Sequence, residues 1–128
     1  MTDRDLINAA IAAAKNSYSP YSGMKTGAAV ECSDGTVFTG TNVENAALGS
    51  TVCAEVSAIC AAVSAGKRHF SRIAVWTDRP GYFTPCGNCR QMLQEFSPGV
   101  EVLCVNGEGR YVSYPLKSLL PMPFNKDV

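Results

Sequence analysis

The sequence has no apolar run close to the roughly 20 residues that a membrane-spanning helix needs, so we expect no membrane partner. It also has no block of like charge, because 11 basic and 11 acidic residues are interspersed and cancel formally. A protein that binds long nucleic acids usually carries a basic face, so we expect no nucleic-acid partner either. The neutral balance favours a small ligand that is recognised locally.

Signal-peptide pattern, internal repeats and linkers are also absent from the sequence. Six cysteines could form the disulfide framework of a secreted protein, but two of them lie in a C-x-x-C motif, Cys86 to Cys89. This spacing favours a metal site in a reducing compartment, so we expect a cytoplasmic protein. A chain of 128 residues fits a single domain, 1–128, that buries its own core.

The periodicity of apolar residues predicts an alternation of helices and strands. A first helix precedes Ser19-Pro20, and a hairpin follows, with strands 27–32 and 36–41 around an Asp34-Gly35 turn. Further helices are predicted at 53–65, 87–96 and 115–120, and further strands at 73–77, 100–105 and 111–113. This order predicts an α/β domain with a mixed sheet of about five strands and helices on both of its faces.

Three cysteines and one acid carry the strongest chemical signal: Cys53, Cys86, Cys89 and Glu55. A structural zinc site is closed by four protein ligands, whereas a catalytic site keeps one position open. The predicted helix starts would place thiolates where unpaired N–H groups stabilise them. Glu55 is a carboxylate beyond what the metal needs, so the pattern indicates catalysis. The spacing C-x-E followed by P-C-x-x-C is the general signature of zinc deaminases that act on nucleobases.

Several motifs in order resemble the small, homotetrameric cytidine deaminases that bind zinc through three cysteines, and the resemblance covers nearly the whole chain. The motifs are Tyr18-Ser-Pro-Tyr-Ser22, Gly27-Ala-Ala29, Asn42-Val-Glu-Asn-Ala46, Cys53-Ala-Glu55, Pro85-Cys-Gly-Asn-Cys-Arg-Gln91 and Leu119-Leu-Pro121 with Phe124. The resemblance implies a three-layer α/β/α fold and one zinc ion per subunit, bound by Cys53, Cys86 and Cys89.

The resemblance also implies a reaction and a substrate. A zinc-activated water would attack C4 of free cytidine or deoxycytidine, and Glu55 would carry protons to N3 and to the leaving amine. Uridine or deoxyuridine and ammonia would result, as in pyrimidine salvage. The residues implied to bind this nucleoside are Asn42 and Glu44 at the ribose, Ala54 through its backbone N–H at the base, Met24 at the base-stacking position, and Phe124 reaching into a neighbouring subunit's site of a homotetramer.

Three residues depart from the family pattern. Val56 stands where many relatives carry an arginine that offsets the charge of three thiolates, and Arg90 is the cation that remains available nearby. Leu48 replaces a common tyrosine, and Met24 replaces the usual phenylalanine. The last two departures bear on affinity and substrate range rather than on the reaction type.

Other functions fit parts of the same pattern. A deaminase of a modified cytosine nucleoside such as blasticidin S also has a small residue after C-A-E, but the retained Glu44 favours an ordinary ribose, since it would otherwise be buried and unpaired. Polynucleotide-editing deaminases typically use histidine as the first ligand and need a basic channel. A zinc-stabilised binding module without catalysis would leave Glu55 free to vary.

The substrate-binding candidates and the other cysteines also fit ordinary structural roles. Turn chemistry is the alternative for Asn42 and Glu44, and core packing is the alternative for Met24 and Phe124. Cys60 falls on the apolar stripe predicted for the helix 53–65, together with Val56, Ile59 and Val63. We expect Cys32, Cys60 and Cys104 to be core residues and His69, the single histidine, to be solvated.

Overall fold

The computed structural model describes residues 1–126 and contains one mixed five-stranded sheet. Its strands are β1 (Thr26–Cys32), β2 (Val37–Thr41), β3 (Phe70–Thr77), β4 (Glu101–Val105) and β5 (Tyr111–Pro115). They lie in the order β2-β1-β3-β4-β5. The pair β3 and β4 is parallel, and the other neighbouring pairs are antiparallel. The predicted mixed sheet with an antiparallel hairpin is therefore confirmed.

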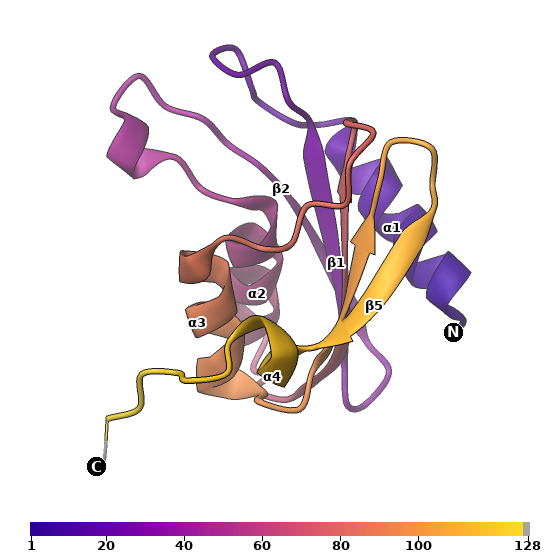
Figure 1. Cartoon of the computed structure of the whole chain (residues 1–128), viewed down its shortest axis with the longest axis vertical. Coiled ribbons are helices and arrows are strands. Elements are labelled where there is room, and N and C mark those ends of the chain that lie inside the picture. The colour runs from indigo at the N-terminus through magenta and orange to yellow at the C-terminus, as the bar shows by residue number, and fades with distance from the viewer. Residues whose placement is uncertain (127–128) are drawn as a thin grey trace.

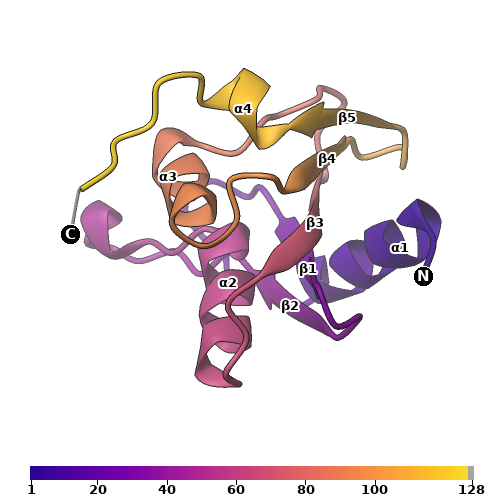
Figure 2. The same cartoon turned by 90° about the horizontal axis from the view of Figure 1, so that it is seen from below.

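Helices cover both faces of this sheet, as Figures 1 and 2 show. The helix α1 (Asp3–Ala14) packs on one face, while α2 (Ala54–Ser64) and α3 (Gly87–Phe96) pack on the other. A short helix α4 (Leu116–Leu119) follows β5, and a 3-10 turn, η1 (Leu48–Ser50), precedes α2. The predicted α/β/α layering is confirmed. Each helix within residues 1–126 is too short or too polar to cross a bilayer.

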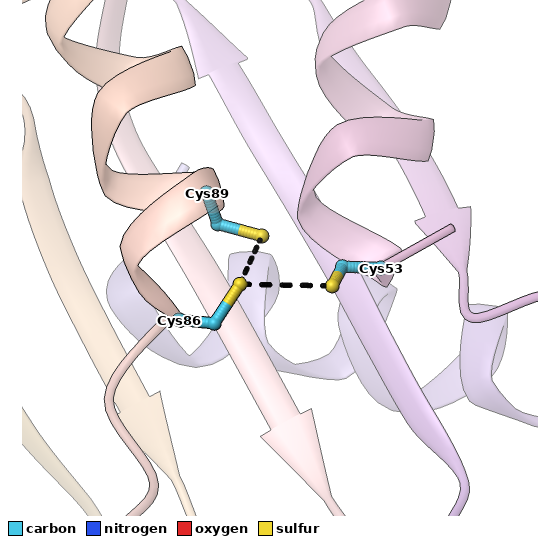
Figure 3. A group of neighbouring side chains, drawn as sticks. All are labelled: Cys53, Cys86 and Cys89. Atoms are coloured by element: carbon cyan, nitrogen blue, oxygen red, sulfur yellow. Dashed lines mark hydrogen bonds between the residues drawn. The ribbon is translucent and has the colours of Figure 1, made fainter. Parts of the chain in front are cut away.

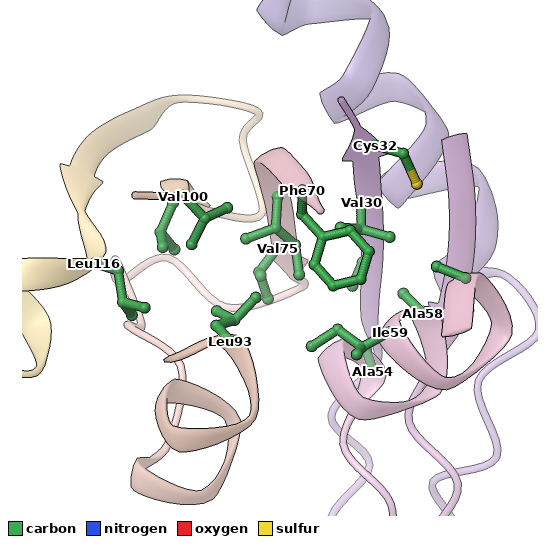
Figure 4. Close-up of a cluster of buried hydrophobic side chains, with 14 of the residues drawn as sticks. Val30, Cys32, Ala54, Ala58, Ile59, Phe70, Val75, Leu93, Val100 and Leu116 are labelled. Carbon is green, nitrogen blue, oxygen red and sulfur yellow. The ribbon is translucent and has the colours of Figure 1, made fainter. Parts of the chain in front are cut away.

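Two separate apolar clusters hold the three layers together. The larger cluster lies between the sheet and α2 and α3 (Figure 4), with Val30, Ile59, Phe70, Val75 and Leu93 among its buried members. The smaller cluster packs Leu6, Ile7 and Ala10 of α1 against the opposite face. Since burial of apolar area is the dominant favourable term in folding, these clusters hold α1 on one face of the sheet and α2 and α3 on the other.

The buried face of α2 differs from the predicted stripe. Ala54, Ala58, Ile59 and Ala62 are fully buried, whereas Cys60 is exposed. The expectation that Cys60 is a core residue is therefore wrong. The small alanine side chains face the sheet because α2 lies very close to β2. Of the predicted stripe, Ile59 is buried and Val63 packs partly buried against the core, whereas Cys60 turns outward.

The close approach of α2 to the sheet depends on Gly40 in β2. A methyl group on Gly40 would lie 2.4 Å from the backbone N of Ala58 and 2.7 Å from the backbone O of Ala54. We expect Gly40→Ala to lower the free energy of unfolding in urea by about 1–3 kcal/mol, the usual effect of overpacking. Gly99→Ala, where a methyl group meets open space, is the matched control and should differ little from the original protein. Equal stability of the two variants would contradict this account.

Candidate active site

Three cysteines meet where the N-termini of α2 and α3 come together (Figure 3). Cys53 is the N-cap residue of α2, Cys86 is the N-cap residue of α3, and Cys89 lies in the first turn of α3. Their sulfur atoms all lie within 4.8 Å of one another, with 3.8 Å between Cys53 and Cys86 and 3.5 Å between Cys86 and Cys89. The two helix starts thus bring together groups that are 33 residues apart in the chain.

This arrangement fits a zinc ion. A Zn–S distance of about 2.3 Å in a tetrahedral site places neighbouring sulfurs about 3.8 Å apart, close to the separations observed. Cys89 is buried, Cys53 is half-buried and Cys86 is exposed, so the cluster opens toward solvent on one side. Three soft ligands with an open side match a catalytic rather than a closed structural zinc site.

Hydrogen bonding within the cluster already favours a thiolate. The thiol of Cys89 lowers the pKa of Cys53 to about 7 by donating to its sulfur. The pKa of Cys89 is raised, first because its thiol proton is held in the hydrogen bond to Cys53 and second because the side chain is buried. Zinc binding requires its thiol ligands to lose their protons, so a lowered pKa at Cys53 favours binding of the metal.

Glu55 is a buried acid in the first turn of α2, with only 5% of its surface exposed. Burial is the main reason that the pKa of its carboxyl group is raised. A carboxyl group whose pKa moves toward neutrality can both take up and return a proton near pH 7. Glu55 is therefore equipped for proton transfer beside the cysteine cluster.

Arg90, the cation next to Cys89, stabilises the loop before Cys86 through hydrogen bonds. Its guanidinium group donates to the backbone O of Pro85 at 2.7 Å and to the hydroxyl of Thr84 at 2.8 Å. A third bond, of 3.0 Å, joins it to the backbone O of Leu119 at the end of α4. Arg90 thus fixes the approach of the chain to Cys86, and the N-termini of α2 and α3 place partial positive charge at the cysteines.

A cavity of about 310 Å³ opens beside the cluster, which is a suitable size for a small molecule. Most of the residues predicted for the site line this cavity: Met24, Asn42, Glu44, Cys53, Ala54, Glu55 and Cys86. Cys89 is fully buried at the start of α3. The structure therefore brings the acid, two of the three cysteines and the predicted sugar-binding residues to one cavity, and Cys89 lies beside the other two cysteines beneath its wall.

Asn42 is largely occupied by bonds within the protein. Its side-chain oxygen accepts from the hydroxyl of Ser17 at 2.5 Å and from the backbone N of Thr26 at 3.1 Å. Its amide nitrogen donates to the backbone O of Met24 at 2.8 Å. One amide N–H is left for a ligand, so Asn42 has a structural role in this turn and also lies in the cavity wall.

Phe124 and Leu48 lie outside the cavity of their own chain. Phe124 is 72% exposed and Leu48 is 75% exposed. Phe83, which the sequence did not single out, does line the cavity. It lies in the loop between β3 and α3, where no periodic pattern could have identified it; its place just before the Pro85-Cys86 motif is the one available signal.

The remaining cysteines and the histidine lie away from the cluster. Cys32 and Cys104 are buried, which confirms the expectation that they are core residues. Burial raises the pKa of Cys104 to about 11, so its thiol stays protonated at neutral pH. His69 is exposed, as predicted.

Comparison with known proteins agrees with this geometry. The model of a family described as "Cytidine and deoxycytidylate deaminase zinc-binding region" matches residues 1–105. A cytidine deaminase of Sporosarcina psychrophila is 41% identical over 116 residues, covering 90% of this chain and 85% of the relative. One of Halalkalibacterium halodurans is 40% identical over 123 residues, covering 95% and 93% of the two chains.

A solved structure extends the likeness to three dimensions. The crystal structure of cytidine deaminase from Burkholderia pseudomallei superimposes with a TM-score of 0.93 at 44% sequence identity. The match covers 97% of this chain and 100% of that chain. With a family match over most of the sequence, relatives similar over nearly their full length and a common fold, the chain belongs to the cytidine and deoxycytidylate deaminase family.

Proposed function

We propose that this chain is an enzyme that hydrolyses free cytidine and deoxycytidine to uridine and deoxyuridine and releases ammonia. The observation that carries the proposal is a buried acid, Glu55, in the same small cavity as a three-cysteine cluster with zinc-like spacing. The names of the relatives support the nucleoside over a modified substrate such as blasticidin S.

The three cysteines and Glu55 carry the chemistry in this proposal. Cys53, Cys86 and Cys89 hold one zinc ion per subunit, which when bound acts as a Lewis acid that makes water a nucleophile near neutral pH. Glu55 takes a proton from the water that attacks C4, then delivers protons to N3 and to the departing amine.

The other residues of the cavity bind and orient the nucleoside. The N–H of Ala54, in the first turn of α2, lacks an acceptor within the helix and is available to the base. The remaining N–H of Asn42 and the carboxylate of Glu44 bind ribose hydroxyls. Met24 packs against the base.

The wider setting follows from the same proposal. We assign the chain to pyrimidine salvage in the cytoplasm, as one domain spanning 1–128. We also propose a homotetramer whose sites are shared, because Phe124 is 72% exposed and lies away from the cavity of its own chain. An aromatic side chain so placed is free to enter the site of a neighbouring copy.

The test is an ammonia-release assay on the zinc-loaded protein with cytidine, deoxycytidine and blasticidin S, together with metal analysis of the same sample. We expect turnover of both ordinary nucleosides and about one zinc ion per chain, as three thiolate ligands at one site imply. Absence of turnover on cytidine by zinc-loaded protein would reject the proposal. Turnover of blasticidin S alone would favour the alternative substrate.

Phe83 provides a narrower prediction about the base. Among the described residues that line the cavity, it is the one aromatic side chain, and Met24 cannot supply an aromatic stack. We expect Phe83→Leu to raise the KM for cytidine by roughly two- to tenfold with little change in kcat, as loss of a ring–ring contact implies. Tyr82→Leu, a neighbouring exposed aromatic outside the cavity lining, is the control. An unchanged KM for Phe83→Leu would remove Phe83 from the binding site.

A further inference from the structure

The carboxylate of Glu44 is held by the loop that precedes β1. Its Oε1 accepts from the backbone N–H groups of Tyr21 at 2.9 Å and Ser22 at 3.0 Å. Its Oε2 accepts from the hydroxyl of Ser22. These three bonds, with the Ser22 hydroxyl first among the causes, lower the pKa of Glu44 and keep it ionised at neutral pH.

The hydroxyl of Ser22 also forms a hydrogen bond with Met24, a second residue of the cavity wall. It accepts from the backbone N–H of Met24 at 3.0 Å. Ser22 itself is exposed and does not line the cavity, whereas Glu44 and Met24 both do. One hydroxyl group therefore connects two wall residues from different segments of the chain. Glu44 follows Ser22 by 22 residues, whereas Met24 lies in the same loop as Ser22.

The number of bonds to Glu44 limits what it can do for a ligand. An ionised carboxylate offers about four acceptor positions, and three of them are used by Tyr21 and Ser22. The fourth position lies on Oε2, the same oxygen that the Ser22 hydroxyl holds. The direction of this remaining position depends on the bond from Ser22.

We propose that Ser22 is a positioning residue for the sugar: its hydroxyl aims the free acceptor of Glu44 at a ribose hydroxyl and anchors Met24 beside the base. The inference rests on the proposed function, because it requires Glu44 to receive the sugar. Loss of the hydroxyl leaves the carboxylate on two backbone bonds to Oε1, free to turn Oε2 away from the substrate.

The test compares Ser22→Ala with the original protein on cytidine and on 2′,3′-dideoxycytidine, both zinc-loaded. We expect kcat/KM on cytidine to fall about tenfold, mainly through KM, since a hydrogen bond to a charged group is lost. The dideoxy nucleoside lacks the 2′- and 3′-hydroxyls, which are the groups proposed to meet Glu44, so on it we expect a change smaller than about twofold, on the order of one weak contact. Ser22→Thr keeps the hydroxyl and should retain most of the activity on cytidine. Ser22→Gly should behave as Ser22→Ala.

A matched control removes a similar bond elsewhere. The hydroxyl of Ser113 in β5 donates to Glu101 at 2.7 Å, so Ser113→Ala deletes a serine–glutamate bond in the β4–β5 pair. We expect this variant to leave the kinetics on both nucleosides unchanged. An equal loss on both nucleosides with Ser22→Ala, or no loss on either, would overturn the inference. Failure of the original protein to turn over cytidine would instead reject the proposed function, so the two failures can be told apart.

Discussion

Replacement of Glu55 by glutamine is expected to lower kcat on cytidine by roughly 10²- to 10⁴-fold, the range that general acid–base catalysis contributes. Glutamine keeps the shape of the side chain and its place in the cavity, but it cannot exchange a proton. The zinc content should stay unchanged, because the sulfur cluster does not include Glu55. Steady-state kinetics and metal analysis on one preparation check both statements.

Stability distinguishes a catalytic role of Glu55 from a structural one. Burial raises the pKa of Glu55 in the folded chain, so its ionised form lowers stability as the pH rises through that pKa. At neutral pH the zinc-free Glu55→Gln variant should therefore unfold at the same or a higher urea concentration than the original protein. Glu95→Gln, at an exposed position of α3, is the control and should keep full activity. Activity of Glu55→Gln close to that of the control would reject the role of Glu55.

Substitution of Cys86 by serine is expected to abolish measurable turnover by removing zinc. A neutral hydroxyl is a far poorer zinc ligand than a thiolate, so the affinity should fall by more than about 100-fold, beyond the usual effect of losing a supporting contact around a metal. Mass spectrometry of metals after dialysis against a weak chelator measures the loss. Since Cys86 is exposed, the fold should persist, as judged by an unchanged far-UV spectrum.

Cys60→Ser is the matched control for Cys86→Ser. Both cysteines are exposed, but Cys60 lies in the last half of α2 and outside the sulfur cluster. This variant should keep its zinc and its activity. Retention of zinc by Cys86→Ser, or loss of zinc from Cys60→Ser, would contradict the assignment of ligands.

The sulfur cluster and Glu55 could be predicted because their signal is local. The residues 53–55 and 85–89 are short motifs at helix starts, and helix starts are also marked locally in the sequence. The hairpin was predictable for the same reason, since Asp34-Gly35 specifies its turn. The mixed character of the sheet followed from the alternation of strands and helices, whereas the pairing of β3 with β4 was not specified by that pattern.

The surroundings of the motifs depend on contacts that the sequence does not mark. The exposure of Cys60 is not predictable from the pattern because most residues that α2 buries against the sheet are alanines, and alanine carries a weaker hydrophobic signal than cysteine or valine. Side-chain partners of Asn42 and Glu44 lie in an earlier part of the chain that no local pattern connects with them. Ser22, for example, bonds Glu44 from 22 residues earlier. Phe83 lies in an irregular loop, where tertiary packing alone decides the direction of a side chain.

The graded exposure of the three sulfur ligands has a consequence for how active enzyme accumulates in a cell. The apolar clusters that stabilise the sheet lie behind the cysteines and include neither Cys53 nor Cys86, so the chain is expected to fold before it acquires its metal. Cells short of zinc would then contain folded but inactive chains. Quality-control proteases, which degrade unfolded chains, would leave them intact. Under those conditions the amount of this protein would overstate the amount of its activity.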